Sequence, residues 1–376
     1  MTCSTSSSAR AALAALALGL AAGCAGPRPS APGNGAAERP PPRLLVLPLE
    51  NLSGGAAPLR DLGLAVEVAV ASRGIEVITG DLLEAFLAKY RIRNTGGLDR
   101  AAARAARDDL GVDGVLVTTL GSFSENPPRL SLTMRLISTG GDPAVSWIEG
   151  YSRSGDESPG LFGLGVVESL DPLRSQALEG LTASLAAYLA GKGPAGRPCP
   201  GGGWFRPRVA YRGQAGDSGP RTILVLPFLN ETRRRGAGEL VALELVRQLA
   251  TAGGFQVFEP GIVRDQLLRF RVVMEGGVSV DQARSMLNAL DGDYVMAGTV
   301  FAYDDGGGVP SASFSALVIE RKTGRIVWDS TSYNKGDDSE SLFGLNRVST
   351  GSGLICRMAR NVVEALAGRQ SLPPRP

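Results

Sequence analysis

Histidine is absent from the 376-residue chain, so no mechanism that needs an imidazole base near neutral pH is open to it. The most common protein ligand of transition metals is missing for the same reason. Cysteine is scarce, and its positions have no metal-site spacing: Cys3, Cys24, Cys199 and Cys356. The sequence therefore predicts no catalytic residue, no metal and no other cofactor, and the protein is not expected to be an enzyme.

A large excess of one charge is also missing. Lysine and arginine number 39 and aspartate and glutamate 37, which leaves a net charge of +2. A protein that binds nucleic acid through its phosphates has a larger and clustered basic excess, so no nucleic-acid partner is predicted. The adjacent acidic pairs Asp108-Asp109 and Asp337-Asp338 are interpreted as a helix end and a loop rather than as acid–base groups. No small-molecule substrate is inferred.

The apolar content is sufficient for a packed core. Hydrophobic residues make up 43% of the chain, which argues against wholesale disorder. A length of 376 residues corresponds to about two domains. The 50 glycines and 24 prolines indicate long stretches without helix or strand.

The first 23 residues have the pattern of a secretory signal peptide. Arg10 precedes an apolar run over 11–20 that is too short to span a bilayer and ends in small residues. The segment Leu20–Cys24 resembles the bacterial lipoprotein box, in which small residues precede an invariant cysteine. The resemblance implies cleavage before Cys24 and lipidation of its side chain. An ordinary signal peptide cut near Ala22 is the alternative.

The position of the mature chain follows from the same resemblance. Ala25, rather than aspartate, comes after the lipidated cysteine, which favours an anchor in the outer membrane with the chain facing the periplasm. Residues 24–42 form the lipid anchor and a proline-rich tether, because proline interrupts helix and strand. In the polyproline conformation this tether reaches roughly 50 Å. Residues 369–376 are expected to be a disordered tail.

An internal duplication covers most of the remaining sequence. Residues 44–51 return as residues 223–230 with five of the eight positions identical. Trp147 and Trp328 share nearly the same offset, and so do two Leu-Phe-Gly-Leu segments. The constant spacing predicts two tandem domains and a linker rich in glycine and proline. Their ranges are 43–190 for the first repeat, 191–220 for the linker and 221–368 for the second repeat.

Each repeat shows the same order of predicted elements. Unbroken apolar runs indicate buried strands, alternation indicates half-buried strands, and helical spacing marks the helices. Asp81 is expected to cap a helix with Glu84, Ser279 and Gln282 form a similar capping pair, and Gly111 ends a helix. The predicted strands are 44–49, 75–78, 114–120, 129–137 and 144–151, with counterparts at 223–229, 255–258, 294–301, 312–320 and 325–331. The predicted helices are 59–72, one from Asp81, 98–110 and 173–190, with 239–251, 280–290 and 353–367 in the second copy.

Strand–helix–strand followed by a meander predicts an α/β or α+β fold. Each repeat should contain a mixed sheet of about five strands covered by helices. Residues 130–136 alternate leucine and methionine with Ser131, Thr133 and Arg135, so this strand is expected to have one solvent-exposed face and antiparallel neighbours.

The motifs resemble a known superfamily. An apolar strand Leu224–Asn230, the segment Asp293-Tyr294-Val295 and the segment Thr323–Trp328 are similar to the curli-assembly (CsgG-like) and TolB amino-terminal domain superfamily, here in tandem. The resemblance covers residues 43–190 and 221–368 and implies the fold. It does not determine one function, because that superfamily supplies pores, adaptors and enzyme activators.

Candidate contact residues lie in three segments, and each has two interpretations. The Leu-Phe-Gly-Leu segments are either core packing or docking loops. A loop of three arginines is either solvated or a site for an acidic partner or lipid headgroup. The aromatic residues from Trp204 either dock on one domain or contact a partner. The residues concerned are Leu161, Phe162, Leu342, Phe343, Arg233, Arg234, Arg235 and Trp204.

Two cysteines remain in the mature chain once Cys24 is lipidated. The periplasm is oxidising, so the two cysteines Cys199 and Cys356 either form a disulfide or stay free. The sequence does not supply the geometry that would decide between these alternatives. Trp147 and Trp328 are predicted to be core residues of the last strand of each repeat.

Two functions are carried forward. The first is a lipid-anchored, non-catalytic periplasmic binding or adaptor protein of an envelope assembly, whose partners are envelope proteins or further copies of itself. The layout of anchor, tether and domain also resembles lipoprotein activators of penicillin-binding proteins. The alternative is a subunit of an outer-membrane secretion complex related to the curli exporter. The short connections 124–128 and 304–310 leave no room for the membrane-crossing hairpins that such an exporter needs.

Overall fold

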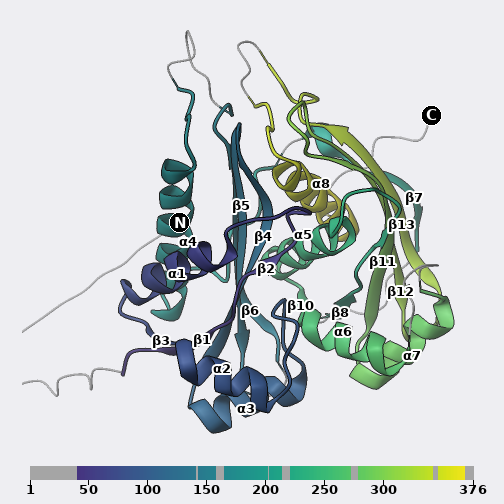
Figure 1. Ribbon diagram of the computed structural model, residues 1–376. Coiled ribbons are helices and arrows are strands. Elements are labelled where there is room, and N and C mark those ends of the chain that lie inside the picture. Colours follow the sequence, from purple (N-terminus) through teal and green to yellow (C-terminus); the bar gives the residue numbers. More distant parts are fainter. Residues whose placement is uncertain are drawn as a thin grey trace, which may run out of the picture. The chain divides into compact units, whose positions relative to one another are not determined.

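The computed structural model of the chain shows a mixed α/β protein with two sheets (Figure 1). The unit from Pro41 to Pro376 is compact, and the fold described here is that of this unit. The signal peptide, Cys24, both Leu-Phe-Gly-Leu segments and the tail 369–376 lie outside the described residues. Described are residues 40–140, 143–157, 165–201, 203–213, 221–271, 278–341 and 346–368.

The first repeat contains a six-stranded sheet in the order β3-β1-β4-β5-β6, and β2 pairs with β4. The strands β1 and β3 run parallel, whereas β4, β5 and β6 form an antiparallel meander, as the alternation predicted. The strands are β1 (Arg43–Val46), β2 (Glu50–Asn51), β3 (Glu76–Ile78), β4 (Gly114–Glu125), β5 (Pro128–Ser138) and β6 (Val145–Ser154).

The second repeat repeats this topology and adds one strand. Its order is β10-β8-β11-β12-β13-β7, and β9 pairs with β11. The additional edge strand β7 (Arg208–Arg212) comes from the linker and pairs antiparallel with β13. The others are β8 (Arg221–Val225), β9 (Leu229–Asn230), β10 (Phe255–Val257), β11 (Tyr294–Asp304), β12 (Ser311–Glu320) and β13 (Ile326–Lys335).

The helices follow the predicted order. They are α1 (Leu59–Ala71), α2 (Gly80–Lys89), α3 (Arg100–Leu110), α4 (Leu170–Leu189), α5 (Ala237–Ala252), α6 (Pro260–Arg269), α7 (Val280–Leu290) and α8 (Gly351–Leu366), with a short 3-10 helix η2 (Gly203–Phe205). Ser279 and Gln282 form the predicted capping box, and Gly111 ends α3 with a φ of 63°. The predicted cap at Asp81 is wrong, because α2 begins one residue earlier and Thr79 is its N-cap.

Each sheet has an inner and an outer face, and these names are kept below. The inner face of the first sheet packs on α1 and α4, and the inner face of the second sheet packs on α5 and α8. The outer face of each sheet carries the two middle helices of its own repeat at one end, α2 and α3 in the first and α6 and α7 in the second. Trp147 and Trp328 are buried in the inner cores, as predicted.

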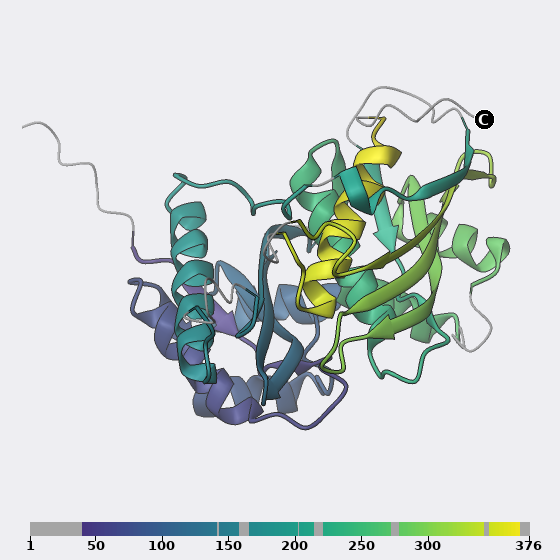
Figure 2. The same cartoon turned by 90° about the horizontal axis from the view of Figure 1, so that it is seen from above.

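The two repeats stack on one another. Helices α5 and α8 lie between the two sheets, so that the layers run α1 and α4, first sheet, α5 and α8, second sheet (Figures 1 and 2). The outer face of the first sheet is therefore covered by the second repeat. The predicted solvent-exposed face of β5 is wrong for this reason, since Ser131, Thr133 and Arg135 are all buried. Among the described residues, no helix combines the length and the apolar character that a membrane span requires.

Candidate functional site

A cluster of charged side chains joins the two repeats at the outer face of the first sheet. Arg135 on β5 is 1% exposed, and its Nη2 lies 3.6 Å from Oε1 of the fully buried Glu259. The same guanidinium donates hydrogen bonds to the carbonyl oxygen of Gly96 at 2.5 Å and to the hydroxyl of Thr119 at 3.3 Å. Arg264 on α6 donates to the same carbonyl at 3.0 Å. Both arginines thereby tie a loop of the first repeat to α6 of the second.

The local sequence explains how Glu259 comes to be buried. It is the N-cap of α6, and its Oε2 accepts hydrogen bonds from the backbone amides of Gly261 and Ile262. Proline at the first helical position suits this cap. A Cβ atom at Gly97 would lie 2.4 Å from the Glu259 carboxylate, so the close approach of the two repeats at this point requires glycine.

Burial raises the pKa of Glu259 from its ordinary value of 4.5 to about 7, although Arg135 and Arg264 oppose the shift. The folded protein therefore holds this proton more tightly than the unfolded chain does. We expect the contribution of Glu259 to stability to increase as the pH falls from 7 to 4.5, by about 3 kcal/mol.

Thermal melts of the wild type and of Glu259→Gln across this pH range measure the effect. The variant keeps the helix cap but does not titrate, so the two melting curves should differ most above pH 7 and converge below pH 5. Parallel pH dependences in the two proteins would contradict the assignment.

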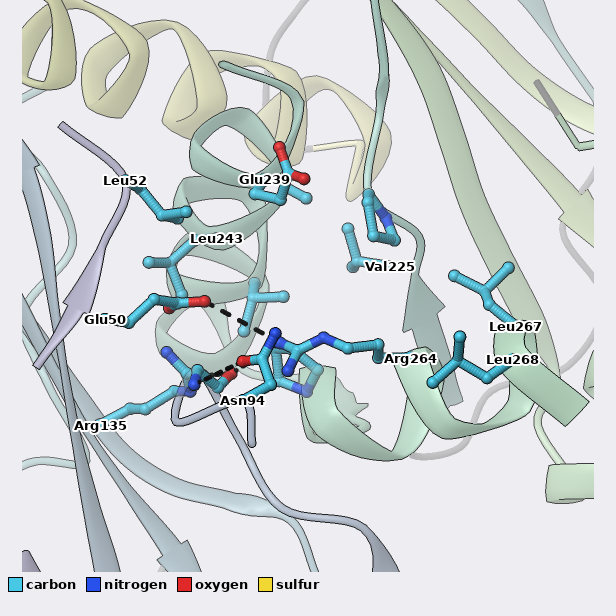
Figure 3. A pocket seen from close by; sticks show the side chains of 15 residues that line it. Glu50, Leu52, Asn94, Arg135, Val225, Glu239, Leu243, Arg264, Leu267 and Leu268 are labelled. Carbon is cyan, nitrogen blue, oxygen red and sulfur yellow. Dashed lines mark hydrogen bonds and ion pairs between the residues drawn. The ribbon is translucent and has the colours of Figure 1, made fainter. Parts of the chain in front are cut away.

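A pocket of about 330 Å³ opens above this charged cluster (Figure 3). Its walls are mostly apolar and come from α5, α6 and β8, and its polar end is formed by Glu50, Arg135 and Arg264. The Arg264 guanidinium lies 3.9 Å from the Glu50 carboxylate, which also accepts a hydrogen bond from Thr119 at 2.8 Å. These charges thus face one another, and their evident role is to hold the repeats together.

A second set of contacts fixes α5 and α8 on the outer face of the first sheet. Arg247 donates to the carbonyl of Gly150 at 3.2 Å, and the hydroxyls of Ser152 and Thr350 lie 2.7 Å apart. Ser122 donates to Asp305 at 2.8 Å. Small residues allow this approach, because a Cβ at Gly150 would lie only 2.5 Å from the Arg247 guanidinium.

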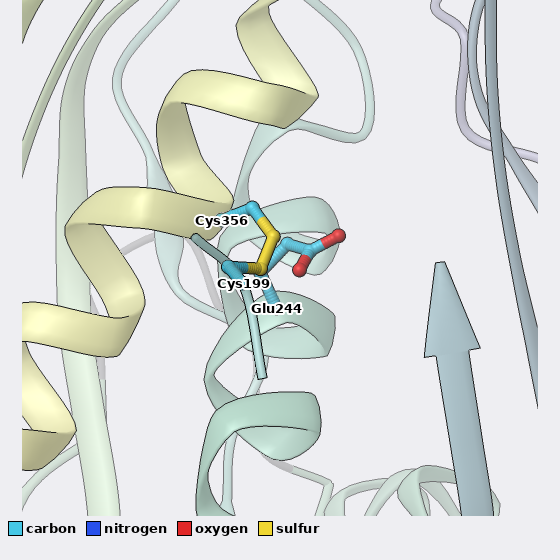
Figure 4. A group of neighbouring side chains, drawn as sticks. All are labelled: Cys199, Glu244 and Cys356. Carbon is cyan, nitrogen blue, oxygen red and sulfur yellow. A yellow bond between two sulfur atoms is a disulfide. The ribbon is translucent and has the colours of Figure 1, made fainter. Parts of the chain in front are cut away.

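Cys199 and Cys356 form a disulfide, which the sequence alone did not decide (Figure 4). Their Cα atoms are 5.8 Å apart, within the normal range. The bridge joins the linker to α8 and lies against α5, where Arg247 and Gln248 donate to the two sulfur atoms. The buried Glu244 carboxylate lies beside the sulfurs, and burial raises its pKa.

In the part of the chain that the structure describes, no helix covers the outer face of the second sheet over β12, β13, β7 and the end of β11 that carries Phe301. Phe301, Tyr333 and Tyr211 are 47%, 60% and 52% exposed. The strand register places Tyr211 opposite Asp329 and Tyr333 opposite Ser313 on this face. Serine and threonine surround these aromatic rings: Thr299, Ser311, Ser313, Ser315 and Thr331. We call these residues the open sheet face.

The structure places the other predicted contact residues in different settings. Trp204 is 70% exposed, whereas its neighbour Phe205 is fully buried, so the aromatic segment both docks on the second repeat and presents a side chain. Arg234 matches neither interpretation of the arginine loop. Its guanidinium stacks on the Tyr303 ring at 4.3 Å and donates to the carbonyl of Gly121 at 2.7 Å. Arg233 and Arg235 are exposed. Leu161, Phe162, Leu342 and Phe343 lie outside the described residues.

Several site residues were missed from the sequence: Glu50, Arg135, Glu259, Arg264, Phe301, Tyr211 and Tyr333. Only the exposed aromatics had a readable signal, since Phe301 stands where the first repeat has Gly121 at the same bulge of the sheet. The charged cluster had none, because its members are far apart in the chain and belong to both repeats.

Comparison with known proteins finds only weak similarity in sequence and structure. No protein-family model and no curated protein matches the chain. The PelC dodecamer from Paraburkholderia phytofirmans is 19% identical over 42% of this chain and 95% of its own, with a TM-score of 0.28. Lipoprotein GNA1162 from Neisseria meningitidis is 21% identical over 40% and 99%, with a TM-score of 0.28. The LpoB C-terminal domain from Escherichia coli is 14% identical over 32% and 87%, with a TM-score of 0.26. At these scores the matches decide neither family nor function, and the CsgG-like and TolB resemblance stays a prediction.

Proposed function

We propose that this chain is a lipid-anchored, non-catalytic protein of the bacterial envelope that binds other proteins on the periplasmic side of the outer membrane. The observation that carries the proposal is the open sheet face. Three aromatic side chains, each about half exposed, stand on one sheet among serines and threonines. Aromatic residues are enriched in protein–protein interfaces, and tyrosine with serine is typical of adaptable binding surfaces.

The remaining polar groups support binding rather than catalysis. The charges at the polar end of the pocket are directed at one another and at the carbonyl of Gly96, to which Arg135 of the same repeat and Arg264 of the opposite repeat both donate. The charged cluster thus holds the two repeats together, and the compact unit so formed can present the open sheet face at the end of a tether. Photocrosslinking from position 333 in intact cells tests the binding part of the proposal.

The anchor is tested by Cys24→Ser. We expect this variant to leave the membrane fraction and appear in the soluble periplasmic fraction, because several acyl chains at about 0.8 kcal/mol per methylene would otherwise hold the chain. Cell fractionation with detection of the protein measures the effect, and Cys3→Ser, within the cleaved signal, is the matched control. A Cys24→Ser variant that still sediments with the membranes would count against the lipid anchor.

A further inference from the structure

The duplication gives each repeat the same two kinds of surface, a helix layer and an outer sheet face. In the first repeat the outer sheet face is covered, because α5 and α8 of the second repeat lie on it. The helix layer of the second repeat is covered by the same contact. The two surfaces left over are the α1 and α4 layer of the first repeat and the open sheet face of the second.

The register shows that the covered and the open sheet faces correspond position by position. Thr133 opposite Gly150 in the first sheet matches Ser315 opposite Thr331 in the second. Ser131 opposite Ser152 matches Ser313 opposite Tyr333. Thr133 and Ser131 are buried, and Gly150 and Ser152 contact Arg247 and Thr350. On the second sheet Thr331 and Tyr333 are exposed, and Ser313 and Ser315 are half-buried.

The helix layer of the first repeat offers a matching apolar surface. On α1, Leu62, Val66 and Val70 are buried against the first sheet, as Val241, Leu245 and Leu249 of α5 are against the second. The same alignment of the two helices pairs Leu64 with Leu243 and Val68 with Arg247, which lie on the side of α5 that faces the first sheet. Leu64 and Val68 are 51% and 69% exposed and stand four residues apart, hence on one side of the helix.

We infer that a second copy of this chain covers the open sheet face with its α1 and α4 layer. This contact continues the alternation of sheet and helix layers that the intramolecular contact already shows (Figure 2). In this alignment Val68 of the neighbouring copy would lie against Thr331, as Arg247 lies against Gly150, and Phe301 would lie beside the first turns of its α1 and α4, as Gly121 lies beside Leu240 and Ser352. The inference rests on the proposed function, since it names the partner of the same face.

Charge is consistent with this pairing, whereas residue size requires a wider spacing than inside the chain, because Phe301 and Thr331 stand where the first sheet has Gly121 and Gly150. The open sheet face is rimmed by Arg208 and Lys335 with Asp329. Helices α1 and α4 contain more acidic than basic residues, which is the opposite sign. Gly63 and Gly180 of these helices have open space where a side chain would be, so bulky aromatic rings can approach the helix layer.

A contact between two different surfaces propagates, because every open assembly keeps one free surface of each kind at its ends unless a ring closes. The purified full chain in detergent should therefore sediment as species heavier than one chain, with a mass that rises with concentration. Phe301→Glu and Val68→Glu should each abolish the species heavier than one chain. Leu82→Glu, an equally exposed leucine on α2, should leave them unchanged.

Mixing the two disabled variants gives the decisive result. Phe301→Glu keeps an intact helix layer and Val68→Glu keeps an intact sheet face, so the mixture should form heterodimers and nothing heavier. Circular dichroism confirms that both variants are folded, because single exposed substitutions cost little stability. A wild type that stays monomeric at its highest attainable concentration, or a mixture without heterodimers, would overturn the inference. If Phe301→Glu alone disrupts assembly, the open face pairs with itself instead. A monomer that still crosslinks to envelope proteins from position 333 would overturn this inference and leave the proposed function standing.

Discussion

Above pH 7, where Glu259 is ionised, Arg135→Ala should lower the free energy of unfolding by about 3–5 kcal/mol, because removal of one partner leaves the other charge buried without compensation. Glu259 is fully buried, and its Oε1 accepts no hydrogen bond, so the guanidinium 3.6 Å away supplies its main compensation within the described residues. The carbonyl of Gly96 would also lose a short hydrogen bond. Denaturant titration of the full chain measures the change.

The control is Arg153→Ala on the neighbouring strand. Its side chain is 58% exposed and its nearest carboxylate is 4.0 Å away, so this substitution should stay within about 0.5 kcal/mol of the wild type. The double variant Arg135→Ala with Glu259→Gln should be more stable than Arg135→Ala alone, because no unpaired charge remains. An Arg135→Ala protein as stable as the Arg153→Ala protein would show that the buried pair does not hold the repeats together.

Removal of the disulfide in Cys199→Ala with Cys356→Ala should cost about 2–5 kcal/mol. The bridge connects residues 157 positions apart, and long loops lose much entropy when they are closed in the unfolded chain. It also fastens the linker to α8, where Arg360 donates to the carbonyl of Cys199. We therefore expect removal of the disulfide to weaken the contact between the repeats as well as to lower the melting temperature.

Thermal melts with and without a reductant separate the disulfide from the packing of the two side chains. Reductant present throughout unfolding should lower the melting temperature of the wild type and leave the double alanine variant unchanged. If reductant has no effect on the wild type, or lowers both proteins equally, the disulfide does not account for the loss.

The duplication made the element order of the fold predictable. Local signals were sufficient for Ser279 and Gln282 at the start of α7 and for Gly111 at the end of α3, because a cap depends on a few neighbouring residues. Trp147 and Trp328 were predicted as core residues from strand alternation. Strand ends were less well predicted, since pairing carries β4, β5 and β13 beyond their apolar stretches.

The contact between the repeats was not predictable by the same means. The alternation in β5 indicates only that its two faces differ in polarity. The face with Ser131, Thr133 and Arg135 was predicted to be solvent-exposed because polar side chains are mostly exposed in proteins. What covers this face is a helix pair more than a hundred residues away. The edge strand β7 was missed for a related reason, since its pairing with β13 comes from tertiary context and its own segment is short.

That contact also bears on the two repeats as separate folding units, residues 43–190 and 221–368, which stays a prediction. The first repeat alone would expose the outer face that α5 and α8 cover, including Arg135. The second repeat alone would lose the partner of Glu259. Both fragments should therefore be less stable than the same residues in the full chain.

The central claim is that the open sheet face is a binding surface, and photocrosslinking in intact cells tests it most directly. A photoreactive residue at position 333 should form crosslinked products of defined mass, either with a second copy or with another envelope protein. The same residue at position 82, equally exposed on α2, should form none of them. Crosslinks from position 82 but none from position 333, in cells where the protein is folded and at the membrane, would contradict the account.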